Sequence, residues 1–354
     1  MASLTETAYY ARKIIKNGII LVIAFLIVKN SLTLGVNLIK KYAPKKEVEP
    51  TVDFGKLPPL VFPAGTEVSA MPTINLKLET IQGGLPTLAK ITKVYFMPKR
   101  VNSYLTMERA KSKAKILGFE NEPYQLHHEK DLTYTWENNQ LIKSIFTMAI
   151  TSQNFFYHYD FVNDQSLIQS SLVFNTEAAK EEAINFLREI NLWPADLQGG
   201  EQKLVYYRFV PPDLTETSSL VETDFVRVNF FRKPLDEMPL MPAQTQKANI
   251  TALVAKTGSR RVVEFTYNYF SVDTEVFGTY PLKDATEAWN ELKNGQGYIA
   301  NLGKNENGQI TVRKAYLAYY DPPDEQSYLQ PIFVFEGDRD FIAYVPAVKS
   351  EWIK

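Results

Sequence analysis

Apolar and polar residues follow two different periods along the chain after residue 72. In twelve segments, β-branched and aromatic residues recur at every second position or in short runs, which is the pattern of β-strands. These segments are 91–97, 131–137, 142–151, 154–162, 203–210, 224–232, 249–256, 261–270, 297–302, 310–321, 328–336 and 341–345. Three other segments have apolar residues three and four positions apart and therefore predict helices. They run from Ser103 or Thr106 to Gly118, from Asn175 or Thr176 to Pro194, and from Lys283 to Asn294.

The three predicted helices share one spacing of small and apolar residues, at positions i, i+4 and i+7. The residues are Ala110, Ala114 and Leu117, then Ala179, Ala183 and Phe186, then Ala285, Trp289 and Leu292. Small residues on this face let a helix lie close to a sheet, and each helix is followed by at least two strands. The pattern predicts an α+β fold of about three modules, each a helix on a small antiparallel sheet, over 73–165, 166–245 and 246–354. Any amphipathic helix has similar spacing, so a true internal repeat stays one of two interpretations.

The N-terminal region has a different pattern. Asn17–Val28 has no charged residue, but it would form only about 18 Å of helix, whereas a bilayer core is about 30 Å thick. A transmembrane helix must therefore continue through Ile39 and include Lys29. Such a helix would carry a polar stripe, which lies at the lipid–water interface or faces another helix. The stripe consists of Lys29, Asn30, Thr33, Asn37 and Lys40.

Two alternatives to a membrane anchor fit this region less well. A cleaved signal peptide would need a small-x-small site after the apolar run, and Lys29-Asn30-Ser31-Leu32 is not one. A buried helix of a water-soluble core seldom has a run that is apolar on every side. The pattern therefore favours a membrane anchor over residues 1–46.

The distribution of charge supports this division of the chain. The 354 residues have a formal net charge of -1, yet residues 1–46 hold eight Lys and Arg against the single acid Glu6, or +7, which leaves -8 for the rest. Basic residues beside an apolar segment bind anionic membrane lipid. Because the remainder is acidic, nucleic acid is not an expected partner. Prolines 44, 50, 58, 59, 63 and 72 then predict an extended stalk over 47–72, part of whose apolar sequence can lie along the body.

No catalytic, cofactor-binding or metal-binding residues are predicted. The chain has no cysteine and only three histidines, and His127 and His128 would point to opposite faces of a strand. Three groups of carboxylates lie at predicted strand ends or turns, where acids are also expected for solvation. They are Asp160 with Asp164, Asp321 with Asp324 and Glu325, and Glu336 with Asp338 and Asp340.

Aromatic residues on the predicted strands are candidates for ligand binding. They are Phe265, Tyr267, Tyr269, Tyr316 and Tyr320. Such residues stack on sugars or grip a peptide, but they also form cores beneath helices.

The C-terminal segment 280–348 resembles the YycH/YycI family. The resemblance is carried by Tyr280-Pro-Leu-Lys-Asp-Ala285 with Ala288 and Trp289, by Val312–Tyr320, by Tyr328–Gly337 and by Ala343–Val348. It implies PepSY-like modules and a membrane-anchored, extracytoplasmic regulator of a sensor kinase that has no catalytic residues. The basic residues on both sides of the apolar run do not decide orientation, so an extracytoplasmic body is expected from the stalk and from this resemblance.

The sequence therefore predicts a single-pass membrane protein whose extracytoplasmic body has a binding, regulatory or scaffold role without catalysis or cofactor. The expected partners are membrane lipid and envelope membrane proteins, among them a sensor kinase or a second copy of the chain. The alternatives are an envelope glycan hydrolase that uses a carboxylate cluster and a structural subunit of a secretion or pilus complex.

Overall fold

A computed structural model describes residues 9, 12–13, 16–18, 25–26, 28–31, 49–63, 74–125, 132–138, 140–167, 173–258, 261–305 and 307–354. The chain forms two compact units, Met1–Glu49 and Pro50–Lys354. Within the first unit, the described residues up to residue 31 are helical and exposed. No helix in the described ranges has both the length and the apolar character needed to cross a membrane. Lys29 and Asn30 of the predicted polar stripe are helical, whereas Thr33, Asn37 and Lys40 lie outside the described residues.

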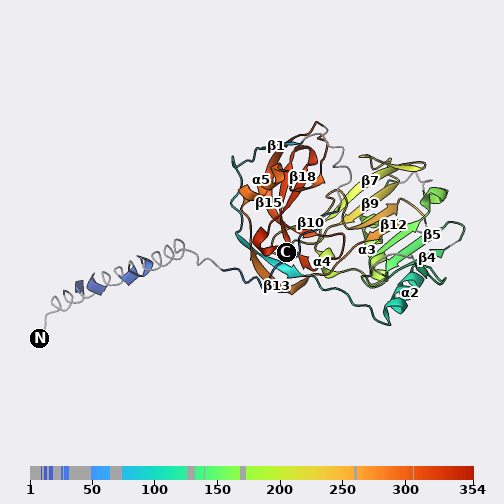
Figure 1. Cartoon of the computed structure of the whole chain (residues 1–354), viewed down its shortest axis with the longest axis horizontal. Helices are drawn as coiled ribbons and strands as arrows, with labels where there is room; N and C mark the ends of the chain where they lie inside the picture. The colour runs from blue at the N-terminus through green and yellow to red at the C-terminus, as the bar shows by residue number, and fades with distance from the viewer. Residues whose placement is uncertain are drawn as a thin grey trace. The chain divides into compact units, whose positions relative to one another are not determined.

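The larger half of the second unit is a nine-stranded sheet in which every pairing is antiparallel (Figure 1). In spatial order its strands are β3 (Tyr124–Gln125), β4 (Thr133–Asn138), β5 (Ser144–Ala149), β6 (Phe155–Tyr159), β12 (Val262–Tyr267), β11 (Ile250–Ala255), β9 (Phe225–Phe230), β7 (Gln202–Val210) and β8 (Asp213–Glu216). The pairing of β6 with β12 joins segments more than a hundred residues apart, with Phe155 opposite Tyr267.

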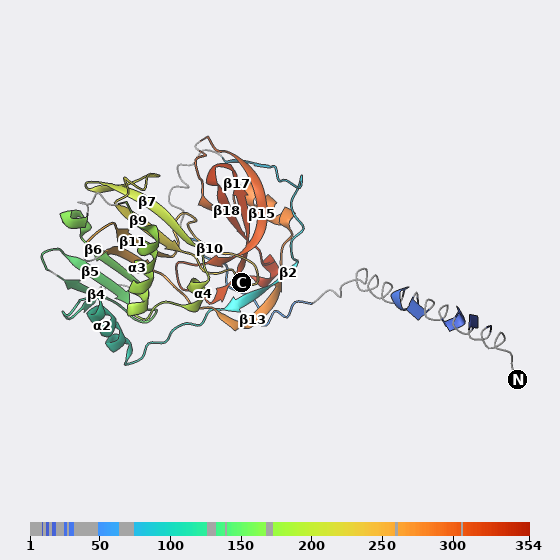
Figure 2. The ribbon, with the colours of Figure 1, turned by 180° about the vertical axis from the view of Figure 1, so that it is seen from behind.

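Two helices lie over one face of this sheet, α2 (Thr106–Ile116) and α3 (Thr176–Glu189), as Figure 2 shows. The predicted small-residue faces point inward, since Ala110 and Ala114 of α2 and Ala179 and Ala183 of α3 are all buried in the core. Asn175 caps α3 by accepting a hydrogen bond from the Ala178 N–H at 3.0 Å. The short α4 (Ala195–Gln198) follows α3, and the 3₁₀ turns η2 (Phe161–Asn163) and η3 (Gln165–Leu167) follow β6.

Hydrogen bonds at its two ends fix where α2 begins and ends. Ser103 N–H donates to the Thr106 hydroxyl at 2.9 Å, which fixes the first turn. Gly118 then adopts φ +88°, and the Phe119 N–H bonds back to the Ala114 carbonyl at 2.9 Å. Gly118 therefore forms a left-handed ending just after the helix, which the sequence predicted to run as far as this residue.

The other half of the second unit is a six-stranded sheet. Its path is β1 (Asn75–Leu78), β15 (Gln309–Asp321), β17 (Pro331–Gly337), β18 (Ile342–Pro346) and β14 (Tyr298–Asn301), and β10 (Leu240–Pro242) also pairs with β15. Both β1 and β10 run parallel to β15. The helix α5 (Ala285–Lys293) packs its Trp289 and Leu292 on one face of this sheet, and Asp284 caps it at the Glu287 N–H. The turns η4 (Asp338–Asp340) and η5 (Ser350–Trp352) complete this half.

The predicted stalk is partly integrated into this second unit. Leu57 is fully buried and forms a bridge to Ile353, and the Phe62 ring stacks on Tyr298 with centroids 4.7 Å apart. The second unit also contains a three-stranded sheet, in the order β13 (Asp273–Pro281), β2 (Ile91–Phe96) and β16 (Tyr328–Leu329). The stalk contacts this sheet, because the Val52 N–H donates a hydrogen bond to the Thr279 carbonyl of β13. Residues 50–63 therefore belong to the folded body, as the apolar sequence of the stalk suggested.

The predicted fold class is wrong. The chain is mostly β: in residues 50–354 the structure describes eighteen strands and four short α-helices. No helix in the described ranges is long and apolar enough to span a membrane. In place of a separate small sheet for each helix, one sheet takes strands from segments assigned to all three predicted modules. A small sheet has unpaired backbone groups along both edges, and the pairing of β6 with β12 removes two such edges.

Candidate binding groove

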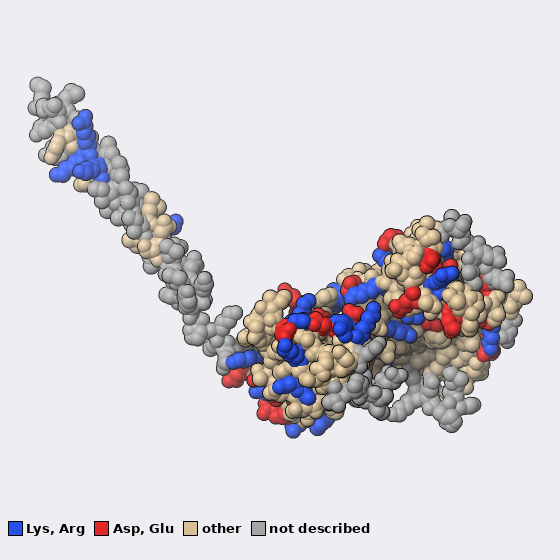
Figure 3. Space-filling model, turned by 90° about the horizontal axis from the view of Figure 1, so that it is seen from above, with Lys and Arg blue, Asp and Glu red and all other residues tan. Residues whose placement is uncertain are grey.

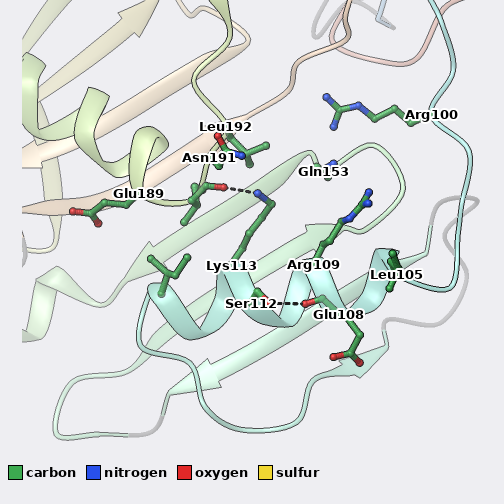
Figure 4. A pocket seen from close by; sticks show the side chains of 12 residues that line it. Arg100, Leu105, Glu108, Arg109, Ser112, Lys113, Gln153, Glu189, Asn191 and Leu192 are labelled. Atoms are coloured by element: carbon green, nitrogen blue, oxygen red, sulfur yellow. Dashed lines mark hydrogen bonds between the residues drawn. The ribbon is translucent and has the colours of Figure 1, made fainter.

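A groove of about 650 Å³ lies between α2 and the end of α3 (Figure 4). Its walls are one side of α2, the segment that leads into α2, the turn between β5 and β6, and the four residues from Glu189 to Leu192. Two turn residues with left-handed backbone shape it, Gln153 at φ +63° and Asn191 at φ +54°. Asn191 ends α3 and leaves the Ile190 carbonyl facing α2.

Three basic side chains line this groove: Arg100, Arg109 and Lys113. Arg100 donates a hydrogen bond to the Ser152 carbonyl at 2.8 Å, and the Lys113 ammonium donates to the Ile190 carbonyl. The Arg109 guanidinium forms no hydrogen bond or ion pair with any residue that the structure describes. In Figure 4 the Arg109 side chain extends from α2 toward Gln153, whereas Lys113 extends toward the turn at Asn191, where a dashed line marks its hydrogen bond.

The groove is locally short of negative charge. Its two acids, Glu108 and Glu189, point away from the basic groups in Figure 4, and neither forms an ion pair with a described residue. Burial lowers the pKa of Lys113, and the nearby Arg100 and Arg109 lower it further. An anion placed among these three side chains would relieve that repulsion.

The groove shares a wall with a smaller cavity of about 290 Å³, which is also lined by Arg100, Arg109 and Gln153. We call the groove and this smaller cavity together the Arg100 groove. Because the two share lining residues, an extended ligand can contact both. A separate cavity of about 1020 Å³ also has Arg100 and Thr151 in its lining and reaches the acidic Asp324–Glu325 turn.

Apolar side chains are exposed along the same surface. Val101 and Tyr104, in the loop before α2, are 87% and 89% exposed, and Leu105 and Ile116 are 40% and 54% exposed. Leu105 and Ile116 line the groove itself, and Val101 lines its smaller cavity. Elsewhere the surface is mixed, since Lys and Arg are interspersed with Asp and Glu over the face drawn in Figure 3. Clustered exposed apolar groups beside charge mark interaction surfaces.

A second polar cluster lies between the two large sheets and has a structural role. Arg232 has a side chain only 5% exposed, and it pairs with Asp196 at 2.7 Å and with Asp321 at 2.9 Å. Asn249 also donates to Asp321, and the guanidinium lies over the Tyr269 ring, 4.9 Å from its centroid. Burial raises the pKa of Asp321, and Arg232 opposes this shift. The groups satisfy one another, so this cluster joins the sheets and leaves no position for a ligand.

No family model matches the chain, and no curated protein matches it. Several solved structures are similar to it, among them two at low identity. An uncharacterized protein from Eubacterium rectale is 12% identical, with 74% of this chain and 84% of that one covered at a TM-score of 0.41. The C-terminal domain of YpeB from Bacillus megaterium is 10% identical, with coverage of 71% and 95% at a TM-score of 0.35. Neither match names the YycH/YycI family, so that resemblance stays a prediction.

The aromatic residues singled out from the sequence lie on two different sheets. Phe265 and Tyr267 on β12 are buried beneath α3, and the Tyr269 hydroxyl donates to Asp196 at 3.1 Å. On β15, Tyr320 is buried and Tyr316 donates its hydroxyl proton to Glu336. None of these five side chains lines the Arg100 groove, and Tyr269 lines the separate cavity beside the Asp324–Glu325 turn.

The three carboxylate groups have local partners in the structure. Asp164 accepts hydrogen bonds from Tyr159 and Ser166, and Glu325 pairs with Lys99 at 3.1 Å. Asp338 accepts two hydrogen bonds from Arg313, at 2.8 and 2.6 Å. Nothing in the described residues positively indicates catalysis, and among them no group of three His, Asp or Glu side chains is arranged to hold a metal.

The groove residues were missed at the sequence level, although one signal was present. Arg109 and Lys113 are four positions apart on α2 and therefore lie on one face as like charges, which destabilises an isolated helix.

His127 and His128 lie outside the described residues, and His158 is 3.9 Å from Glu264 on the neighbouring strand.

Proposed function

We propose that this chain is a membrane-attached, non-catalytic binding protein of the cell envelope, whose extracytoplasmic body acts by docking a partner protein. One observation carries the proposal: the Arg100 groove combines three basic side chains, one of them without a partner among the described residues, with exposed apolar side chains. Arginine and tyrosine dominate the energetics of protein interfaces. Arg100 and Arg109 line the groove, and the exposed Tyr104 directly precedes the lining residue Leu105.

Membrane attachment is supported by the first unit of the chain. Residues 1–46 carry a charge of +7 around the apolar Asn17–Val28 run, and residues 1–49 are a unit separate from the body. The expected partner is another envelope membrane protein, with a sensor kinase and a second copy of this chain as the two specific hypotheses.

Site-specific crosslinking in intact cells tests the docking role. A photo-reactive amino acid in place of Tyr104 should crosslink the full-length protein to a membrane protein, and Arg109→Gln should reduce the yield. Leu141 is a matched control, because it is also exposed and apolar but lies in the loop between β4 and β5, whereas Tyr104 directly precedes the groove residue Leu105. Equal yields from Tyr104 and Leu141 would contradict a docking surface at the groove.

Cell fractionation tests the attachment. The full chain should sediment with membranes at moderate salt, whereas residues 50–354 should stay in the supernatant. Protease added to spheroplasts should degrade the body if it lies outside the cytoplasm, and protection until lysis would reverse the orientation.

A further inference from the structure

We propose that the Arg100 groove binds an acidic, partly apolar segment of its partner in extended conformation. This inference rests on the proposed docking function and adds the chemistry of the ligand. It follows from three properties of the groove: the sign of its charge, its mixed lining and its extent.

The sign of the charge comes from Arg109 and Lys113. Arg109 has no counter-ion among the described residues, and the Lys113 ammonium donates to a neutral backbone carbonyl. A guanidinium binds a carboxylate through two parallel hydrogen bonds, so Arg109 is the natural contact for an Asp or Glu side chain. Lys113, one helical turn along α2, can contact a second carboxylate.

The mixed lining separates a polypeptide from a simple anion. Leu105, Ile116 and Leu192 line the groove together with the basic groups. A free phosphate or a sulfate would leave these apolar side chains in water. A segment with alternating acidic and apolar residues would cover both kinds of surface at once.

The extent of the groove favours a chain over a compact headgroup. The cavity in Figure 4 shares Arg100, Arg109 and Gln153 with the smaller cavity beside it. Basic groups on a flat or convex surface suit a membrane, whereas Arg109 and Lys113 lie on the walls of a groove between two helices. An extended segment can follow the groove past Arg100 toward Thr151.

The test uses the full chain in detergent and a short fluorescent peptide of alternating glutamate and leucine. Fluorescence anisotropy should show saturable binding that Arg109→Gln weakens by about tenfold, as expected for the loss of one charge-assisted contact. Lys115→Gln is the matched control, because Lys115 is on the same helix, is exposed and does not line the groove. Since the Arg109 side chain has no described partner, its substitution should leave the fold intact, and circular dichroism checks this.

Three results would overturn the inference. Equal weakening by Arg109→Gln and Lys115→Gln would show general charge attraction, and equal binding of a glutamine–leucine peptide would show that the charge is irrelevant. Binding to phosphatidylglycerol vesicles that depends on Arg109, without peptide binding, would assign the groove to lipid headgroups. If the peptide fails to bind but Tyr104 still crosslinks to a membrane protein in cells, the docking function stands and only the ligand chemistry fails.

Discussion

Replacing Arg232 by Met should destabilise the body in a way that depends strongly on pH. Met has a similar length but no charge, so Asp321 would lose the partner that lies 2.9 Å away. The Asp321 side chain is only 14% exposed, whereas Asp196 is 23% exposed and still accepts a hydrogen bond from Tyr269. Removing one partner of a buried ion pair costs about 3–5 kcal/mol, and we expect this loss near pH 7.

The pH dependence follows from the direction of the Asp321 shift. Burial raises its pKa in the folded state, so its contribution to stability is greatest at low pH and is lost as the pH rises through the folded-state pKa. Without Arg232 the folded-state pKa of Asp321 rises further. The pH range over which stability falls as the pH increases, between the unfolded-state and the folded-state pKa, therefore becomes wider. Each pH unit within the window is equivalent to about 1.4 kcal/mol. The penalty of Arg232→Met should therefore be smaller at pH 5 than at pH 7, by up to about 3 kcal/mol.

Urea unfolding of residues 50–354, followed by tryptophan fluorescence at both pH values, measures this penalty. The matched control is Arg232→Met combined with Asp321→Asn, which removes the titrating group and should be more stable at pH 7 than Arg232→Met alone. A penalty that is the same at pH 5 and pH 7, or a double variant no more stable than the single one, would refute the argument. It would mean that water reaches Asp321 once the guanidinium is gone.

Two further predictions concern residues 50–63, the integrated part of the stalk, and the close approach of Gly200 to a backbone carbonyl. Removal of residues 1–49 should leave the urea midpoint of the body unchanged. Removal of residues 1–63 should lower the stability of the body by several kcal/mol, because the buried Leu57 and the stacked Phe62 are lost. Equal midpoints for the two deletions would show that residues 50–63 do not stabilise the body. Gly200→Ala should destabilise the body by about 1–3 kcal/mol, since its Cβ would lie 1.8 Å from a backbone oxygen, while Gly199→Ala meets nothing closer than 3.5 Å. Equal melting temperatures for these two variants would contradict the close approach of Gly200 to the Phe231 carbonyl.

The individual elements could be predicted from the sequence because their signals are local. The period of two over 310–321 and the asparagine cap at Asn175 both reappear in the structure, as β15 and the start of α3. The pairing of distant strands has no such signal. Nothing in residues 155–159 indicates that their neighbour in the sheet is β12, and the three residues of β10 are too short to show a period. The fold class was wrong for this reason, since it depends on which strands share a sheet.

The candidate groove could not be predicted for the same reason. Its residues come from the segment before α2, from α2, from one turn and from the end of α3, and only the folded chain brings them together. The aromatic residues gave a clear pattern because strand cores are aromatic, and so they indicated the core more reliably than the binding surface. A like-charge pair such as Arg109 and Lys113 is a weaker signal in the sequence, but core packing does not explain it.

The mostly β fold and the groove have a common geometric origin. Nine strands about 4.8 Å apart make a sheet roughly 40 Å wide, whereas two helices about 10–12 Å across cover little more than half of that width. Alanines on α2 and α3 bring both helices close to the sheet, so the space between them is left to long side chains. That space contains the cavity with Arg109 and Lys113, and a further one of about 430 Å³ that shares Ile116 and Glu189 with it and reaches the sheet at Tyr157. The described residues that line these two cavities belong to α2, to α3, to the strands and to their connecting segments, with no third helix among them, and Arg109 is exposed there.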